Sequence, residues 1–362
     1  MNLSSRARQE WRIILWVSLG SAVISAYFGY AVGGSTPMHS AMMGIVNSVV
    51  IATPIMLYEV KGQRVAALRR LRRLPLLVYF GLKVLFYVVV IIGGLVVVRV
   101  LFGSSEIMPF DEVFRGSIAF AVAMSVLANL AFEMGSLLGF GTLKNLLSGR
   151  YMQPKLEQKA FLLIDMKDST GLAERLGSIH FHELLNAFFR DVADAALECE
   201  AEIHKYVGDE AILTWPDGRS LANGDCLACP FVARNFIVAN GGQYRERFGV
   251  VPEFRAALHY GEIVAGEIGD VRREIAYVGD TLNVAARLLD ATKMIGRDVV
   301  VSSDLLERAA LPSGIGAEAL PILTVRGRAA PLGISALQCL GGDFRFPGSD
   351  RTTAPSFFRG QR

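Results

Sequence analysis

The stretch Phe161–Thr170 reads FLLIDMKDST, and a second stretch, His204–Ile212, reads HKYVGDEAI. The first is an apolar run that stops at Asp165, and the second is a short strand-like run that turns at Gly208 and presents Asp209. Two carboxylates at the ends of two adjacent buried strands make a site of hard oxygen ligands, which suits Mg²⁺, and Mg²⁺ in turn suits phosphates. One aspartate after a strand would be read as an ordinary turn residue, but the pair favours a functional site.

A third stretch, Val278–Arg287, reads VGDTLNVAAR. Its Gly-Asp-Thr predicts a turn into a helix on which Asn283 and Arg287 are four residues apart, so both side chains project from one face. These three stretches, in this order and at this spacing, resemble the class III nucleotide cyclases, the adenylate and guanylate cyclase family. The resemblance covers about residues 157–338.

The resemblance implies an α+β, ferredoxin-like catalytic domain, and the expected order strand, helix, strand, strand, helix, strand agrees with it. Within this order, Glu253–His259 and Glu262–Glu267 are expected to form two strands around Tyr260-Gly261. It implies attack of the ribose 3′-oxygen of a nucleoside triphosphate on the α-phosphorus, with release of pyrophosphate. In this family the metal-binding aspartates come from one chain and the Asn/Arg pair from another. Because this chain has one copy of each motif, we expect a homodimer with two equivalent sites.

The motif residues carry over one by one. Asp165 and Asp209 match the family's two metal-binding aspartates, with the backbone carbonyl of Met166 as a further ligand, which implies two Mg²⁺ or Mn²⁺ ions per active site. Asn283 matches the asparagine that orients the ribose. Arg287 matches the arginine that stabilises the transition state.

Two positions match those that read the base. Lys205 falls where adenylate cyclases place the lysine that reads the purine, which supports ATP over GTP because guanylate cyclases usually have Glu there. The second base-reading position falls near Ala276, whose side chain can neither donate nor accept a hydrogen bond. The expected reaction is therefore conversion of ATP to cyclic AMP, with a guanylate cyclase left open as the alternative.

Two further regions are expected to meet the phosphates. The amides around Asp168, Ser169 and Thr170, at a helix start, can receive phosphate oxygens. The family often has Gly at the Asp168 position, so a negative side chain there is a departure. Arg326 sits where the family has a phosphate-binding lysine, and Arg keeps the charge while adding a fork of donors.

The first part of the chain has a different composition. Hydrophobic residues make up 52% of the 362 residues, mean hydropathy is +0.38, and nearly all of the excess precedes residue 141. A bilayer core needs about 20 apolar residues per helix. The stretches that reach or approach this length are about Trp11–Val32, Ala41–Tyr58, Leu74–Val100 and Ser117–Phe140. We therefore expect an all-α, four-helix transmembrane domain in the lipid bilayer, followed by the α+β domain.

The charges between these stretches alternate. Basic residues gather before the first stretch, in the second loop and after the fourth, as at Arg8, Arg69 and Lys144, whereas the first loop carries no Lys, Arg, Asp or Glu. The positive-inside rule then places both termini and the catalytic domain in the cytoplasm of a bacterial inner membrane. The net charge of +3 gives no reason to expect nucleic acid as a partner. The outer loops are too short for a folded sensor, so any stimulus, whose nature stays open, acts in the membrane or on short periplasmic loops.

Lys83 and Glu133 are ionisable residues within the third and fourth apolar stretches. Lys83 is expected to snorkel to the interface. Glu133 is read either as a residue near the cytoplasmic interface that water can reach or as a buried carboxylate with a signalling role.

The expected domains are a transmembrane domain over 1–147, a coupling linker over 148–158, a catalytic domain over 159–340 and a disordered basic tail over 341–362. Cys226 and Cys229 form a CxxC, which we interpret as two helix residues in a reducing cytosol, because no second pair or histidine set at zinc-ligand spacing accompanies it. The rival hypothesis is a non-catalytic membrane receptor or scaffold that keeps the cyclase fold for dimerisation. Such a protein should have lost a metal carboxylate or the arginine, and this chain has kept both.

Overall fold

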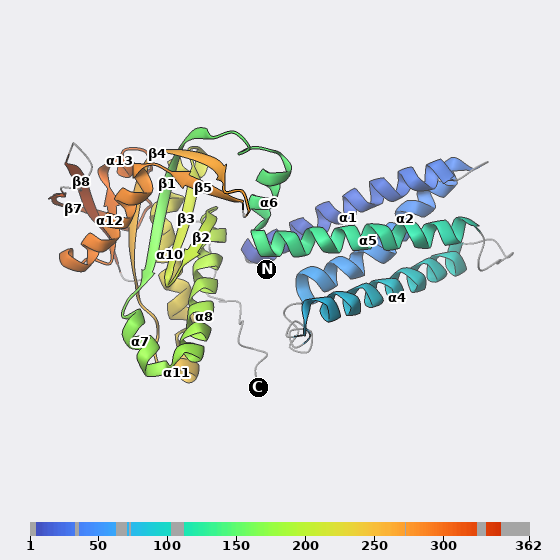
Figure 1. Ribbon diagram of the computed structural model, residues 1–362, viewed down its shortest axis with the longest axis horizontal. Coiled ribbons are helices and arrows are strands. Elements are labelled where there is room, and N and C mark those ends of the chain that lie inside the picture. The colour runs from blue at the N-terminus through green and yellow to red at the C-terminus, as the bar shows by residue number, and fades with distance from the viewer. Residues whose placement is uncertain are drawn as a thin grey trace. The chain divides into compact units, whose positions relative to one another are not determined.

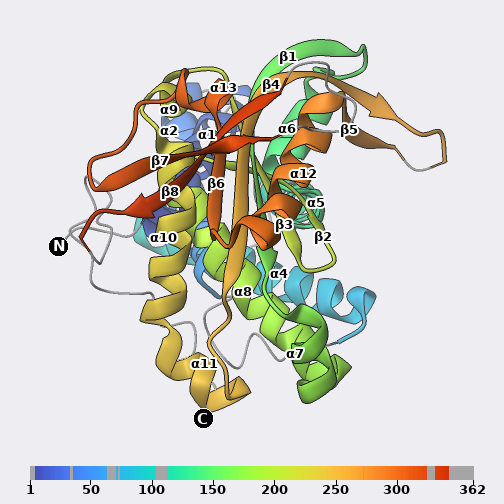
Figure 2. The ribbon, with the colours of Figure 1, turned by 90° about the vertical axis from the view of Figure 1, so that its left-hand side faces the viewer.

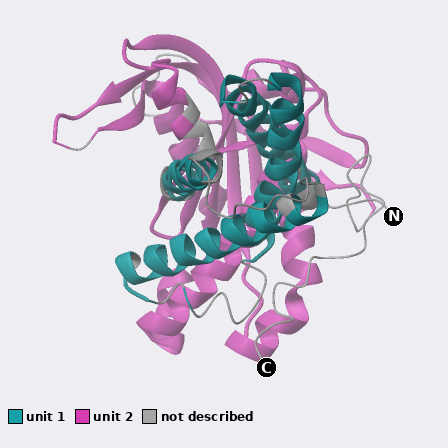
Figure 3. Ribbon diagram, turned by 90° about the vertical axis from the view of Figure 1, so that its right-hand side faces the viewer, with its two compact units in different colours: residues 1, 3–140, 357–362 teal, residues 2, 141–356 magenta. Residues whose placement is uncertain are grey.

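The computed structural model describes residues 5–32, 36–62, 71, 74–102, 112–271, 273–323 and 331–341. These residues group into two compact units that divide between residues 140 and 141 (Figure 3). Each unit is described by itself. The predicted tail, apart from its first residue, lies outside the described residues.

The first unit consists of long helices (Figure 1). They are α1 (Ser5–Val32), α2 (Pro37–Lys61), α4 (Leu76–Phe102) and α5 (Glu112–Leu138). Each contains a segment long and apolar enough to cross a membrane, so the four predicted spans are confirmed by length and composition. Close approach of α1 and α2 depends on small residues, since a side chain at Gly29 would collide with the Ser40 carbonyl and one at Gly44 with the Ser25 carbonyl.

A buried ion-pair cluster joins three of these helices. Lys83 on α4 is 1% exposed, and its Nζ lies 2.7 Å from Oε1 of Glu59 on α2 and 3.0 Å from Oε1 of Glu133 on α5. The expectation that Lys83 snorkels is therefore wrong, because two carboxylates from neighbouring helices solvate its charge inside the unit. Glu133 is a partner in this cluster.

The chain after α5 turns at Gly139, whose φ of 86° lies in the left-handed region, and a separate helix, α6 (Phe140–Leu147), follows. The connector that follows is bound to the sheet, since the amide of Glu267 donates to the Tyr151 carbonyl at 3.0 Å and Tyr151 is buried.

The second unit is built on an eight-stranded sheet in the order β2-β3-β1-β4-β6-β8-β7, with β5 paired to β4. Its strands are β1 (Lys155–Met166), β2 (Glu202–Val207), β3 (Glu210–Pro216), β4 (Phe254–Ile268), β5 (Glu274–Val278), β6 (Val299–Ser302), β7 (Ile315–Leu323) and β8 (Leu332–Cys339). Its helices are α7 (Ser169–Leu176), α8 (Ser178–Glu198), α9 (Arg219–Ala222), α10 (Asp225–Ala239), α11 (Gly241–Phe248), α12 (Asp280–Ile295) and α13 (Ser303–Leu306). The predicted α+β architecture is confirmed.

Helices cover both faces of the sheet. Phe161 and Leu163 of β1 pack with Leu288 of α12 in one buried cluster. On the other face, the ring of Phe254 lies 6.1 Å from the ring of Phe188 on α8. Alternation of side chains along β1 and β4 therefore fixes α12 and α8 on opposite sides.

One predicted break is wrong. Residues Glu253–Glu267 were expected to form two strands around Tyr260-Gly261, but β4 runs through without interruption. Gly261 marks a close approach instead: a Cβ there would lie 2.6 Å from Oγ1 of Thr281, which itself donates to the Glu262 carbonyl at 2.6 Å. The start of α12 is thereby fastened to β4. The hairpin partner β5 was not predicted, and Figure 2 shows the β4–β5 hairpin extending beyond the rest of the sheet.

The CxxC lies inside α10. Cys226 and Cys229 are both buried free thiols, as expected for residues of a packed helix.

Candidate active site

Strand pairing brings the two motif aspartates together. β1 and β3 are antiparallel with Asp165 opposite Glu210, and the amide of Met166 donates to the Asp209 carbonyl at 3.4 Å. Burial raises the pKa of Asp165 to about 6, and repulsion from the neighbouring Asp209 carboxylate adds to the rise. The two carboxylates therefore lie close to one another, as the sequence predicts.

Glu210 is a member of this group that the sequence did not single out. Burial, followed by repulsion from Asp165 and Asp209, raises the pKa of Glu210 to about 7. Lys293 and Arg255 oppose the rise at Asp165 without cancelling it. The register of β1 with β3 was the missing signal, because it places the residue after Asp209 directly across from Asp165. This end of β1 and β3 thus carries more negative charge than the nearby cations balance.

This donor set fits a magnesium or manganese ion. Both cations prefer carboxylate oxygens, and Mg²⁺ usually keeps several waters and takes one or two carboxylates together with substrate phosphates. Among the residues that the structure describes, no group of three or more His, Cys, Asp or Glu could by itself enclose a metal. Asp165 and Asp209 would therefore hold the ion on one side and leave its other positions to phosphates and water.

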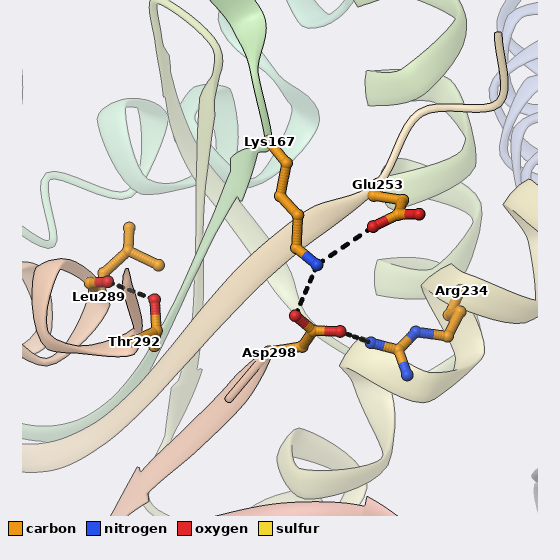
Figure 4. Close-up of polar contacts among 6 residues, drawn as sticks. All are labelled: Lys167, Arg234, Glu253, Leu289, Thr292 and Asp298. Carbon is orange, nitrogen blue, oxygen red and sulfur yellow. Dashed lines mark hydrogen bonds and ion pairs between the residues drawn. The ribbon is translucent and has the colours of Figure 1, made fainter. Parts of the chain in front are cut away.

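A balanced ion-pair cluster surrounds Lys167, just after the end of β1 (Figure 4). Lys167 Nζ is 2.6 Å from Asp298 Oδ1 and 3.1 Å from Glu253 Oε2, and Arg234 is 3.1 Å from Asp298 Oδ2. Lys167 follows Met166 in the chain, yet its charge is directed to these acidic residues. It is therefore not the counter-charge of Asp165.

The start of α7 accounts for the departure at Asp168. Asp168 has φ 53° and ψ 33°, a left-handed conformation that Gly adopts freely and Asp tolerates better than most residues. Its exposed carboxylate lies beside Gly171, 3.5 Å from Arg175, so its charge has a partner within the helix. Ser169 and Thr170 open α7, where the first amides have no acceptor inside the helix.

Asn283 and Arg287 lie on one face of α12, as predicted. Asn283 is exposed and Arg287 half-buried, while Val284 and Leu288 on the opposite face are in the core. Arg287 Nη1 is buried without a hydrogen-bond partner in the described structure. Within those same residues, no hydrogen bond or ion pair joins this face to the carboxylates of β1 and β3.

The base-reading positions meet at the β2 and β5 strands. Lys205 Nζ lies 3.4 Å from Oε1 of Glu274, and together with Ile268 and Gly269 they line a hollow of about 450 Å³. Ala276 is half-buried two residues after Glu274. Glu274 was missed because β5 itself was not predicted.

Arg326 lies outside the described residues. Its assignment as a phosphate-binding residue stays a prediction.

Comparison with known proteins gives a consistent result. No family model matches the chain. The chain is similar to Adenylate cyclase 2 of Rhizobium meliloti (strain 1021), with 39% identity over 228 residues, 62% of this chain and 63% of the relative. It is also similar to an adenylate cyclase of Anabaena cylindrica, with 24% identity over 163 residues, 42% of this chain and 30% of that relative. The chain thus spans less than two thirds of the length of these relatives.

A solved structure, that of a bacterial light-regulated adenylyl cyclase, matches with a TM-score of 0.52 at 13% identity, over 64% of this chain and 66% of that one. A structural match at this low identity shows that the two proteins share a fold. Together with the relatives, it shows that the chain is similar to Adenylate cyclase 2 and that four apolar helices precede a domain with the fold of the adenylyl cyclase structure.

Proposed function

We propose that this protein is a membrane-anchored adenylate cyclase that converts ATP to 3′,5′-cyclic AMP and pyrophosphate at sites shared by two copies of the chain. The observation that carries the proposal is the pairing of β1 with β3, which brings the carboxylates of Asp165 and Asp209 close together with more negative charge than the nearby cations balance. Such a pair costs stability unless a cation joins it, so its presence favours a cation-dependent reaction on a polyphosphate. The 39% identity to Adenylate cyclase 2 supports the choice of reaction.

The chemistry requires loss of the ribose 3′-hydroxyl proton, neutralisation of the triphosphate, and fixed donors for the charge that develops at the α-phosphate. Two Mg²⁺ or Mn²⁺ ions, when bound by Asp165, Asp209 and the Met166 carbonyl, supply Lewis acidity to the 3′-oxygen and the phosphates. Asn283 orients the ribose by hydrogen bonding. Arg287 donates to the charge that develops in the transition state.

The start of α7 binds the phosphate tail. The backbone amides of Ser169 and Thr170 donate to phosphate oxygens, and the positive end of the helix dipole favours the negative charge. Asp168 sets the left-handed turn that precedes these amides, and its carboxylate is engaged with Arg175. Arg326 is assigned to the same role by its charge.

A homodimer would complete the site. Asn283 and Arg287 make no contact with the described carboxylates of their own chain, and Arg287 Nη1 is without a partner there. Apolar side chains are exposed on the elements that carry the motifs, among them Val207 at 51% and Met294 at 82%. Exposed apolar groups next to an incomplete site favour a second copy that covers them and supplies the missing residues.

The four apolar helices support a location in the inner membrane, with multiple spans. The basic residues at the second loop and around the outermost spans favour a cytoplasmic location for both termini and the catalytic domain. The stimulus would reach the protein in the membrane or from the periplasm. We make no assignment of its chemistry.

Turnover by the full-length protein in detergent tests this function. ATP and GTP are supplied separately with Mn²⁺ to the wild type, to Asp209→Asn and to Asp298→Asn, the last a matched control from the balanced cluster. Cyclic AMP from the wild type and the control, but not from Asp209→Asn, is expected. Cyclic GMP as the main product would make the protein a guanylate cyclase, and a purified dimer that binds ATP with Mn²⁺ but forms no cyclic product would favour the scaffold hypothesis.

A further inference from the structure

The base pocket contains a carboxylate where the sequence showed only an alanine. Ala276 occupies the expected second base-reading position but has no polar group. Side chains alternate along a strand, so Glu274 projects from the same face of β5 as Ala276. Both of its oxygens face Lys205, with Nζ–Oε distances of 3.4 and 3.5 Å.

This ion pair is not required by the fold. The side chains of Lys205 and Glu274 are 49% and 43% exposed, and an exposed pair of this kind contributes at most about 1 kcal/mol. The pair lines the hollow of about 450 Å³ together with Ile268, which is paired directly across from Glu274 and is itself exposed. An apolar wall with one donor and one acceptor is what a planar heterocyclic base requires.

Neighbouring residues hold the two strands in place. His204, next to Lys205, stacks on the ring of Tyr277, next to Ala276, with centroids 4.2 Å apart. The Tyr277 hydroxyl lies 3.3 Å from Nζ of the buried Lys159 on β1. The donor and the acceptor of the pocket are therefore presented from supported strands, which favours selective recognition.

We propose that Glu274 is a specificity-determining residue that accepts a hydrogen bond from the 6-amino group of adenine, while Lys205 donates to N1. This assignment rests on the proposed cyclase function. Adenine offers a donor at position 6 beside an acceptor at N1, whereas guanine offers an acceptor at position 6 and a donor at N1. With guanine, the Glu274 carboxylate would face the 6-oxygen, a second acceptor, and the Lys205 ammonium would face the N1 proton, a second donor. The arrangement therefore selects ATP over GTP.

The test compares ATP with purine riboside triphosphate, which lacks the 6-amino group, in full-length protein with Mn²⁺. A hydrogen bond to a charged acceptor is worth about tenfold or more in kcat/KM, so the wild type should prefer ATP by that factor. Glu274→Ala should lower kcat/KM for ATP to the level of the analogue and leave the analogue unchanged. Glu274→Gln keeps an acceptor oxygen and should retain part of the preference.

Glu267→Ala is the matched control. Glu267 lies on the same hairpin but pairs across from Ile275 and so faces the other side, where it contacts Arg273 at 3.3 Å. It should leave the ATP preference intact. An equal loss with both nucleotides in Glu274→Ala would mean that Glu274 only holds Lys205 and would overturn this assignment alone, as would a wild type that uses GTP in preference. A wild type that cyclises no nucleotide would overturn the proposed function, and this inference with it.

Discussion

Two clusters of charged side chains lie near the end of β1, one around Asp165 within the strand and one around Lys167 just after it, and they differ in how their charge is balanced. Around Lys167, two cations meet two carboxylates in direct contact (Figure 4). Around Asp165, carboxylates meet mainly one another, and the pKa values of Asp165 and Glu210 rise to about 6 and 7. The first cluster is complete within one chain, whereas the second lacks positive charge. The difference indicates that the cluster around Asp165 is the one that binds a positively charged ligand.

Removing a carboxylate from the unbalanced cluster should have the largest effect. Asp209→Asn should lower turnover roughly a thousandfold, which corresponds to about 4 kcal/mol of transition-state stabilisation. In metal-free buffer the same change should raise Tm, because it removes repulsion on Asp165. The rise in Tm that Mn²⁺ produces in the wild type should be much smaller in the variant. Turnover within tenfold of wild type would contradict the assignment of the unbalanced cluster to the active site.

The ion-pair cluster around Lys83 in the membrane unit extends the comparison, because its charges are paired inside the unit. Lys83→Met would remove the buried cation that pairs with the half-buried Glu59 and Glu133, which should cost about 3 kcal/mol. Thermal loss of the helical circular dichroism signal in detergent reports the effect. Adding Glu133→Gln should recover part of the loss by lowering the remaining negative charge. Equal stability of Lys83→Met and wild type would show that this cluster does not hold the helices together.

A buried carboxylate away from the active site gives a pH effect of intermediate size. Asp191 accepts hydrogen bonds from Asn240 at 2.8 Å and Tyr244 at 2.7 Å, yet burial raises its pKa to about 6. Because the pKa in the unfolded chain is about 3.9, the folded protein binds the proton more tightly.

Stability from this group is therefore present at acidic pH and is lost as pH rises from about 4 to 6, by about 2 kcal/mol. Asp191→Asn should remove that part of the slope, which urea unfolding at several pH values would measure. An unchanged slope in the variant would assign the effect to other groups.

The smallest effect is expected in the balanced cluster. Lys167→Met removes contacts to Glu253 and Asp298 that are partly exposed, so the loss should stay below about 1 kcal/mol. Turnover should change by no more than about twofold. A loss of turnover as large as that of Asp209→Asn would mean that the two clusters act as one.

The sequence was sufficient for features that depend on local pattern. Apolar runs predicted the four long helices, and the Gly208 turn predicted the hairpin that brings Asp209 to Asp165. The i, i+4 spacing predicted that Asn283 and Arg287 share a face.

Features that depend on pairing between distant segments were not visible. Glu210 and Glu274 join the site through the registers of β1 with β3 and of β4 with β5, which no local spacing encodes. Gly261 was misread as a turn because its reason is the approach of Thr281 from the next helix. Lys83 was misplaced because its carboxylates come from two other helices.

Complementation tests the central proposal, that the unbalanced carboxylates of one chain work with the α12 face of another. Asp209→Asn and Arg287→Ala are produced separately and then together in the same membranes, and cyclic AMP formation from ATP is measured. Each variant alone should be inactive, and co-production should restore about a quarter of wild-type activity, because half of the dimers are mixed and each mixed dimer has one intact site. Activity that stays absent in the mixture, with both variants present as dimers, would contradict a shared site.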